Sequence, residues 1–454
     1  MKFDVVVIGA GSAGCMAALA AARVGATVAL IEKYGFPGGT PVTVGISSLA
    51  PFHYGDRQVV TGIPQEFVDR LQQVGGTLGH MKVENEYGTG SYVCLFDREL
   101  YKHVLLEMLK ENGVNLFMHT IVCEVTVKDN ALIGVIVDDS EGKNEIKGKV
   151  FVDCTGDAVV AYYAGCPTVV GREKDGKVQP ATLMFEMAEI DVPVLWDYLT
   201  KHTNELEWFS RIYPSVQPPN YFNSVFFVAQ GFGEKLKQCP EFERLGRDTV
   251  LFFTGLRRGI VSFNSTRMHL SNPVSAVDLT KAEIEGRAQI SVLEKWLRST
   301  MPGFEDAYLS WVGVKVGVRE SRRIVGRYVL SKEDIVASSR FPDSIAKGFF
   351  PIDVHDPSGR GGYSGGSLWI PLKSTYDIPY RSLIPQVIDN LLVAGRCISV
   401  THEALGSTRV ASCCMALGQA AGVAAALASQ LSVPVPELSL NVLQQWLARV
   451  GQTF

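Results

Sequence analysis

The sequence predicts an α/β fold, in which a discontinuous, Rossmann-like dinucleotide-binding domain with an inserted β-meander is joined to a mixed α/β substrate domain. Three observations predict it. A strand–glycine–helix pattern opens the chain, short apolar runs follow from residue 115 to 152, and a second strand–glycine–helix pattern begins at residue 390. The expected boundaries are 1–52, 95–170 and 386–454 for the dinucleotide-binding domain, and 53–94 and 171–385 for the substrate domain.

The composition is that of a globular enzyme. The 454 residues suffice for two or three domains, and 46% hydrophobic and 20% charged residues exclude a disordered or fibrous protein. A formal net charge of −4 gives no overall attraction to nucleic acid. Nine scattered cysteines without a CxxC pair indicate a reduced chain with no disulfide framework. Because glycines interrupt the apolar start, we expect no membrane segment and a cytoplasmic location.

The first forty residues carry a dinucleotide-binding fingerprint. An apolar strand leads into GxGxxG at residues 9–14, and an alanine-rich helix and a second strand ending at Glu32 follow. In this motif Gly9 permits the tight turn, Gly11 lets the backbone approach a pyrophosphate, and Gly14 permits close helix–strand packing. The helix N-terminus attracts phosphate, and the acid accepts hydrogen bonds from ribose hydroxyls.

Later segments complete the expected domain. The short strands of the meander close at a small-residue turn, and near the C-terminus a buried strand ends at Gly395. A polar loop from Arg396 to Leu405 follows it. Residues 406–408 are then expected to open a long helix of small residues, whose N-terminus could face a negatively charged ligand.

These motifs resemble the FAD-dependent oxidoreductases of the glutathione-reductase-like superfamily, and more closely a bacterial family within it. The matching stretches include VVVIGAGSAGCMAALAAA, FVDCTGD, GVRESRRIVGRYVL, PIDVHDP and NLLVAGRCIS, spread over almost the whole chain. The resemblance implies bound FAD and leaves the substrate open. The FAD contacts that this resemblance implies are Gly9, Gly11, Ser12, Ala13, Gly14, Glu32, Lys33, Gly39, Thr40, Val122, Thr155, Gly156, Asp157, Gly395, Arg396, Gly406, Ser407 and Thr408.

Two histidines are candidates for proton transfer. His402 lies in the loop before the C-terminal helix and is the first choice. His355 is the second, because the acids at 353 and 356 would orient its ring and keep it basic. A structural role is the alternative for each, and Tyr363 and Tyr380 are further proton-donor candidates. His53 is a candidate to reach the flavin and attach it covalently.

Several arginines indicate the chemical class of the substrate. Four guanidinium groups lie between residues 319 and 327, and Arg322 and Arg323 are the candidates for binding a carboxylate, which guanidinium groups hold bidentately. Ion pairing between the domains is the alternative reading. No spacing typical of a metal site occurs, so no metal is expected.

The expected activity is hydride transfer between FAD and a small organic substrate that can carry a carboxylate, with an unidentified separate electron acceptor or donor. A flavin oxidase or monooxygenase and an FAD subunit of an electron-transfer complex are the alternatives. The charge and the lack of a basic tail disfavour nucleic acid as a partner, no membrane partner is expected, and a homo-oligomer stays open. A glycine-rich stretch at 359–366 is a candidate lid.

Overall fold

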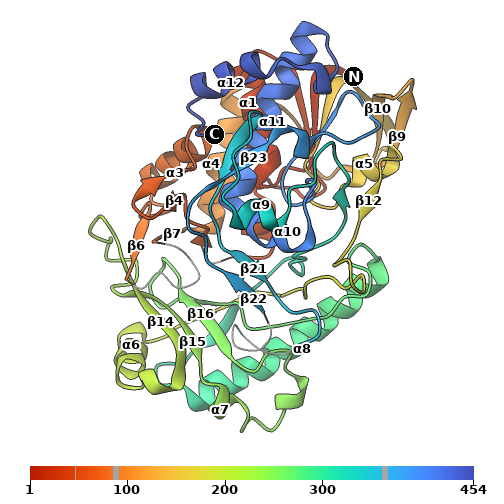
Figure 1. The fold of residues 1–454 in the computed structure, drawn as a ribbon. Helices are drawn as coiled ribbons and strands as arrows, with labels where there is room; N and C mark the ends of the chain where they lie inside the picture. The colour runs from red at the N-terminus through yellow and green to blue at the C-terminus, as the bar shows by residue number, and fades with distance from the viewer. Residues whose placement is uncertain (47, 85–90, 360–366) are drawn as a thin grey trace.

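A computed structural model describes residues 1–46, 48–84, 91–359 and 367–454. It confirms the predicted α/β class. A domain built on a mostly parallel sheet carries both termini, and an antiparallel sheet flanked by a long helix lies below it in the first view (Figure 1).

A seven-stranded sheet forms the centre of the dinucleotide-binding domain. Its order is β8-β2-β1-β11-β10-β9, with β24 also paired to β11. In β1, Val7 lies opposite Leu30 of β2 and Val152 of β11 in parallel pairings, and it is fully buried, as expected for a strand covered on both faces. Strands β9 to β11 form the predicted antiparallel meander. The strands are β1 (Lys2–Ile8), β2 (Val28–Ile31), β8 (Asn115–Phe117), β9 (Ile121–Lys128), β10 (Ala131–Asp139), β11 (Gly142–Asp153) and β24 (Leu391–Val393).

Helices α1 (Ser12–Arg23) and α11 (Ala411–Leu431) pack directly on each other. A Cβ atom at Gly418 or Gly422 would overlap the backbone of Ala13 or Ala17, so only glycine permits this contact. By length and composition α11 could cross a membrane, but its apolar stretch is entirely buried in the protein. The other helices around this core are α2 (Thr40–Thr43), α3 (Ile63–Gln73), α4 (Arg98–Glu111), α5 (Val159–Tyr163), α9 (Lys332–Val336), α10 (His402–Thr408) and α12 (Leu440–Arg449).

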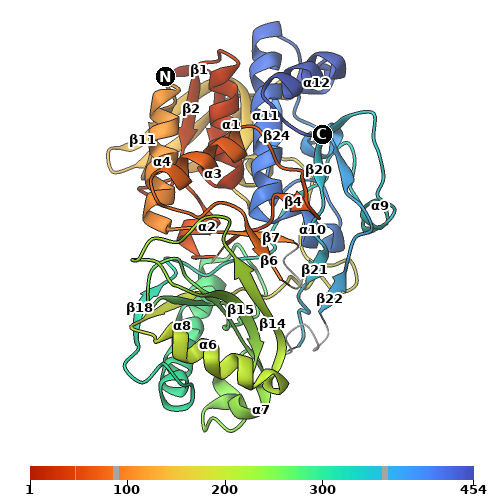
Figure 2. The same cartoon turned by 90° about the vertical axis from the view of Figure 1, so that its left-hand side faces the viewer.

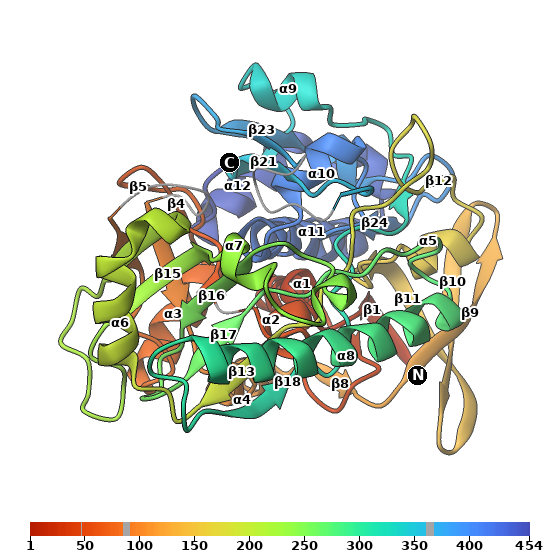
Figure 3. The ribbon, with the colours of Figure 1, turned by 90° about the horizontal axis from the view of Figure 1, so that it is seen from below.

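The second domain is built on a nine-stranded sheet of order β18-β13-β17-β16-β15-β14-β6-β7-β3. Helix α8 (Ala276–Thr300) lies along this sheet, as the view from below shows (Figure 3). Its Trp296 and Leu297 share a buried core with Phe185 and Phe263 of the strands. The strands are β3 (Ser48–Leu49), β6 (Met81–Val83), β7 (Tyr92–Leu95), β13 (Phe185–Ala188), β14 (Leu206–Tyr213), β15 (Phe226–Gly231), β16 (Val250–Thr254), β17 (Val261–Phe263) and β18 (Tyr308–Val312); α6 (Val192–Lys201) and α7 (Gly233–Leu236) complete the domain.

Short strand pairs lie outside the two main sheets. Figure 2 shows β21 and β22 running from the dinucleotide-binding domain toward the second domain. Strand β20 packs against α11 in the same core as α1. The pairs are β4 (His53–Tyr54) with β5 (Arg57–Gln58), β12 (Thr168–Val169) with β19 (Arg323–Ile324), β20 (Ser344–Gly348) with β23 (Tyr376–Pro379), and β21 (Ile352–Val354) with β22 (Leu368–Ile370).

One predicted element is wrong near the C-terminus. The polar loop ends at Thr401, whose hydroxyl accepts a hydrogen bond from the backbone N–H of Ala404 at 3.3 Å and starts α10. Residues 406–408 therefore close a short helix, and the long helix begins after them at Ala411. The cap was missed because a short helix with one turn of apolar pattern is hard to separate from a loop.

Candidate functional site

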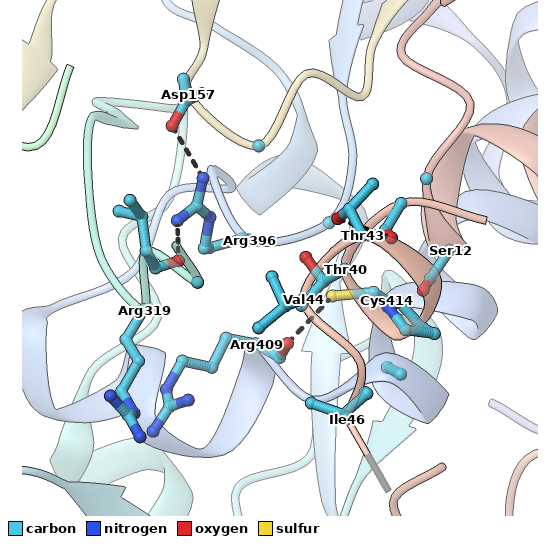
Figure 4. Close-up of a pocket in the computed structure, with 18 of the residues that line it drawn as sticks. Ser12, Thr40, Thr43, Val44, Ile46, Asp157, Arg319, Arg396, Arg409 and Cys414 are labelled. Atoms are coloured by element: carbon cyan, nitrogen blue, oxygen red, sulfur yellow. Dashed lines mark hydrogen bonds and ion pairs between the residues drawn. The ribbon is translucent and has the colours of Figure 1, made fainter. Parts of the chain in front are cut away.

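A cavity of about 680 Å³ lies where the two domains meet. Its walls come from the β1–α1 turn, the β11–α5 turn, the segment after β24, the start of α11, and parts of the second domain between residues 247 and 322. Figure 4 shows side chains from both domains facing this space. Pockets of this size at domain junctions are typical sites for cofactors and small molecules.

The glycine turn at one end of the cavity fits a dinucleotide. Gly9 has a positive φ of 95°, and a Cβ atom there would lie 2.7 Å from the carbonyl oxygen of Cys154. A Cβ atom at Gly39 would lie 2.5 Å from the Cα of Gly11, so two bare backbones meet beside the N-terminus of α1. No side chain caps α1, and its first turn holds no acid. The free N–H groups are thus available to a phosphate, as the FAD fingerprint requires.

Two acids flank this turn. Glu32 is 8% exposed; its carboxylate accepts hydrogen bonds from the N–H of Ala10 at 2.7 Å and of Tyr34 at 3.0 Å. Each oxygen keeps a lone pair for a ribose hydroxyl. Asp157 pairs with Arg396 at 2.7 Å; burial opposes ionisation, but Arg396 and a hydroxyl hydrogen bond still hold the pKa of Asp157 below its usual value.

Most of the predicted cofactor residues line this cavity, and four do not. Gly14 packs α1 against β1 instead. In α10, Gly406 lies against the backbone of Asp353, and the Ser407 hydroxyl hydrogen bonds with that of Tyr376 at 2.7 Å. The N-terminus of α11, at Val410, Ala411 and Cys414, faces the cavity in place of residues 406–408. The lining set is Gly9, Gly11, Ser12, Ala13, Glu32, Lys33, Gly39, Thr40, Val122, Thr155, Gly156, Asp157, Gly395 and Arg396; the others are Gly14, Gly406, Ser407 and Thr408.

His402 and Arg323 lie in a buried ionic cluster away from the cavity wall. Glu320, with no exposed surface, is 2.9 Å from Nδ1 of His402 and forms an ion pair with Arg323. Arg323 also donates to the carbonyl of Val400 at 3.0 Å. Burial alone would raise the pKa of Glu320, but His402 and Arg323 reverse the effect and hold it below its usual value. The cluster ties the segment after β18 to the segment after β24.

His355 does line the cavity, with Nε2 3.4 Å from a carboxylate oxygen of Asp353. Burial lowers the pKa of His355 to about 3, with Arg319 and Arg409 adding to the effect. The expectation that flanking acids keep this ring basic is therefore wrong: Asp353 raises the pKa, but desolvation and the arginine charges outweigh it. His355 is a neutral imidazole near neutral pH.

Arginines gather at this end of the cavity. Figure 4 shows the Arg319 and Arg409 guanidinium groups side by side. Arg319 donates to the carbonyl of Pro180 at 2.6 Å, and burial next to Arg409 and Arg247 lowers its pKa to about 9. Arg409 is 3.4 Å from the carboxylate of Asp353. The sequence analysis did not identify Arg247 and Arg409, which reach the site from distant segments.

Of the two arginines predicted to bind substrate, only Arg322 lines the cavity. Its guanidinium group stacks on the ring of Tyr162 at 4.2 Å, and its buried Nε has no hydrogen-bond partner among the described residues. Arg323 belongs to the buried cluster, so ion pairing accounts for it. Arg319, from the same segment, lines the cavity.

The lesser candidates lie elsewhere. The ring of His53 is 4.8 Å from that of His80 and does not line the cavity, and the Tyr380 hydroxyl donates to a carbonyl at 2.9 Å. Tyr363 and all but the first residue of the glycine-rich stretch fall outside the described residues. Within the described part of the chain no group of histidines, cysteines and acids could hold a metal ion.

Known proteins resemble this chain in part. Digeranylgeranylglycerophospholipid reductase 1 of Methanococcoides burtonii is 28% identical over 171 residues, which are 37% of this chain and 41% of that protein. Digeranylgeranylglycerophospholipid reductase of Methanoculleus marisnigri is 30% identical over 197 residues, 42% of this chain and 47% of that protein. The matched region thus spans less than half of either relative.

Among solved structures, GidA of Aquifex aeolicus has a TM-score of 0.50 at 18% identity, covering 95% of this chain and 64% of that one. This likeness concerns the fold. The family model of FAD dependent oxidoreductases matches residues 4–447. The chain therefore belongs to the FAD dependent oxidoreductase family, and it is a flavoenzyme whose cofactor is FAD.

Proposed function

We propose that this flavoenzyme transfers hydride between FAD and a small organic anion, whose carboxylate is bound by Arg319 and Arg409. The proposal rests on the positive charge at the end of the cavity where Arg319 and Arg409 lie. Two neighbouring guanidinium groups face this space with Asp353 as their shared acid. Bound FAD supplies the hydride or electron transfer, and the chain must orient the substrate and handle a proton.

The electrostatics favour an anion. The low pKa of Arg319 means that its charged form is destabilised where it stands, by burial and by neighbouring cations. A bound carboxylate would remove that penalty and accept paired N–H donors from planar guanidinium groups. With a neutral substrate, the single negative charge of Asp353 would have to serve both guanidinium groups.

His355 is the residue we propose for proton transfer. Asp353 lies next to Nε2 and fixes the orientation of the ring, which leaves Nδ1 to exchange a proton with the substrate. Since Arg319 and Arg409 both lower the pKa of His355, an anion that neutralises them would raise it toward the range where a proton is easily taken up.

A second candidate rests on the apolar wall beside the arginines. Leu251, Phe253, Val274 and Leu279 of the second domain line the same cavity, which leaves room for an apolar body attached to the anionic group. Two relatives that match part of this chain are named as reductases of a glycerophospholipid. Reduction of an anionic lipid is therefore the second candidate.

Anaerobic flavin spectroscopy tests the proposal. Oxidised enzyme and chemically reduced enzyme are each mixed with carboxylic acids, their neutral amides, alcohols, NAD(P)H and an anionic isoprenoid lipid, and the absorbance at 450 nm is followed. We expect a carboxylate to change the flavin spectrum and its amide to fail. Bleaching or reoxidation by the lipid alone selects the second candidate, while equal rates with acid and amide refute the arginine argument.

A matched pair of variants links the result to the cavity. Arg319→Ala should raise KM for the anionic substrate roughly tenfold to a hundredfold, as expected for loss of a charged hydrogen-bond donor. Arg327→Ala is the control, because Arg327 is an exposed arginine of the same segment whose partner Asp389 is 3.7 Å away. An unchanged KM in Arg319→Ala would contradict the proposal. Fast reoxidation in air would favour an oxidase or monooxygenase, and no small-molecule reaction would favour an electron-transfer subunit.

A further inference from the structure

Lys315 belongs to the second domain but reaches the dinucleotide end of the cavity. It lies in the segment that leaves β18 and passes the glycine-rich loop after β2. The N–H of Val314 donates to the carbonyl of Thr43 at 2.7 Å, and the N–H of Gly317 donates to that of Thr182 at 2.6 Å. The backbone of Lys315 is thus held on both sides, against α2 of one domain and the strands of the other.

The side chain of Lys315 faces the same space as the phosphate-binding turn. It lines the cavity together with Gly11 and Ser12, and its Nζ is 5.9 Å from the ring centre of Tyr34, two residues after the ribose-binding acid. Within the described residues, the Lys315 ammonium has no ion pair and no side-chain hydrogen bond. A partly buried ammonium without a partner is costly unless a ligand supplies the opposite charge.

The charged groups around Lys315 do not supply this opposite charge. Glu32 already accepts two backbone hydrogen bonds, and Asp157 is paired with Arg396 and a serine hydroxyl. Glu283 of α8 accepts a hydrogen bond from the N–H of Val316 at 2.7 Å and is paired with Arg287. Lys33 and Arg396 add positive charge beside it. With Lys315, three cations therefore face two acids at the end of the cavity where the bare N-terminus of α1 also lies.

We propose that Lys315 binds the diphosphate of FAD, so that the substrate domain contributes directly to cofactor binding. The two negative charges would pair with Lys315 from one side while the N–H groups of α1 donate from the other. FAD would then bridge the two domains at a point that the nucleotide fingerprint does not include.

Binding to apoprotein tests this without measuring catalysis. Calorimetric titrations of FAD, ADP and adenosine compare ligands with and without a diphosphate, in wild type, Lys315→Met, Lys315→Arg and Lys281→Met. We expect Lys315→Met to weaken FAD and ADP at least about tenfold and adenosine less than about twofold, and Lys315→Arg to retain binding. Lys281, an exposed lysine of α8, is the control and should change nothing.

Two results would overturn the proposal: wild-type affinity for FAD and ADP in Lys315→Met, or an equal loss for adenosine, which would place Lys315 elsewhere than at the diphosphate. If Lys315→Met does not fold, the assignment is tested on the wild-type protein by measuring proton uptake on FAD binding. Burial and the neighbouring cations lower the pKa of Lys315 to about 8 in the free protein, and a diphosphate would raise it. FAD binding at pH 8.5 should then take up a proton, seen as a dependence of the binding heat on the buffer's ionisation enthalpy; no uptake refutes the assignment.

Discussion

Replacing Glu320 by glutamine should destabilise the protein far more than its conservative size suggests. The carboxylate is fully buried and serves His402, Arg323 and the backbone N–H of Gln179 at 3.0 Å. An amide keeps some hydrogen bonds but leaves the buried guanidinium group without its counter-charge. Removing one partner of such a pair costs about 3–5 kcal/mol.

The assay is urea unfolding followed by tryptophan fluorescence at pH 7, with FAD-loaded protein. Glu333→Gln is the control, because Glu333 is an exposed glutamate of α9. Since the protein has two domains, the transition midpoint is compared and no two-state free energy is assumed. A Glu320→Gln midpoint equal to that of Glu333→Gln would refute the argument that this cluster holds the segments together.

The pH dependence gives a second check on the same cluster. The folded-state pKa of Glu320 lies below its ordinary value of 4.5, so its contribution to stability is fully present above pH 4.5 and is lost as pH falls through the folded-state pKa. The difference between the urea midpoints of wild type and Glu320→Gln should therefore become smaller at acid pH. A constant gap would mean that the carboxylate charge is not what stabilises the cluster.

Three further outcomes follow. His402→Asn should lower thermal stability but leave the rate of flavin reduction in the folded enzyme within about threefold, whereas His355→Asn should slow it by roughly a hundredfold with FAD still bound, both measured by stopped flow. Gly39→Ala should lose FAD on gel filtration because its Cβ would meet Gly11, while Gly55→Ala, also at positive φ but with open space around it, should retain FAD. FAD affinity should be highest below about pH 8 and fall as pH rises through the pKa of Lys315 of about 8, because only the ammonium pairs with a diphosphate; Lys315→Arg should abolish that fall.

The dinucleotide-binding half was predictable because its signals are local. The strand, turn, helix and acid of residues 3–32 lie close in sequence, and each residue type has one mechanical reason to be there. The meander was equally readable, since each strand pairs with the next. The nine-stranded sheet was not, because β6 pairs with β14 and β13 pairs with β18, in each case more than a hundred residues away, and such pairing leaves no local pattern.

The catalytic candidates show the same limit. His402 was favoured for its place before the C-terminal helix, but Glu320, 82 residues earlier, holds its ring in the buried cluster. Arg409 and Lys315 come to the cavity only through the docking of the two domains. A sequence reveals which side chains can do chemistry, whereas burial and distant partners decide which of them face the ligand.

The contact between α1 and α11 also affects when the FAD site can form during synthesis of the chain. The cofactor-binding turn and α1 are made before the second domain, whereas α11 and the strand β24 beside β11 are made after it. Until then, the apolar face of α1 that packs on α11 is uncovered, and a nascent chain with this face exposed is prone to aggregate. Because the segment after β24 and the start of α11 both line the cavity, the complete FAD site can form only after these two elements have been made.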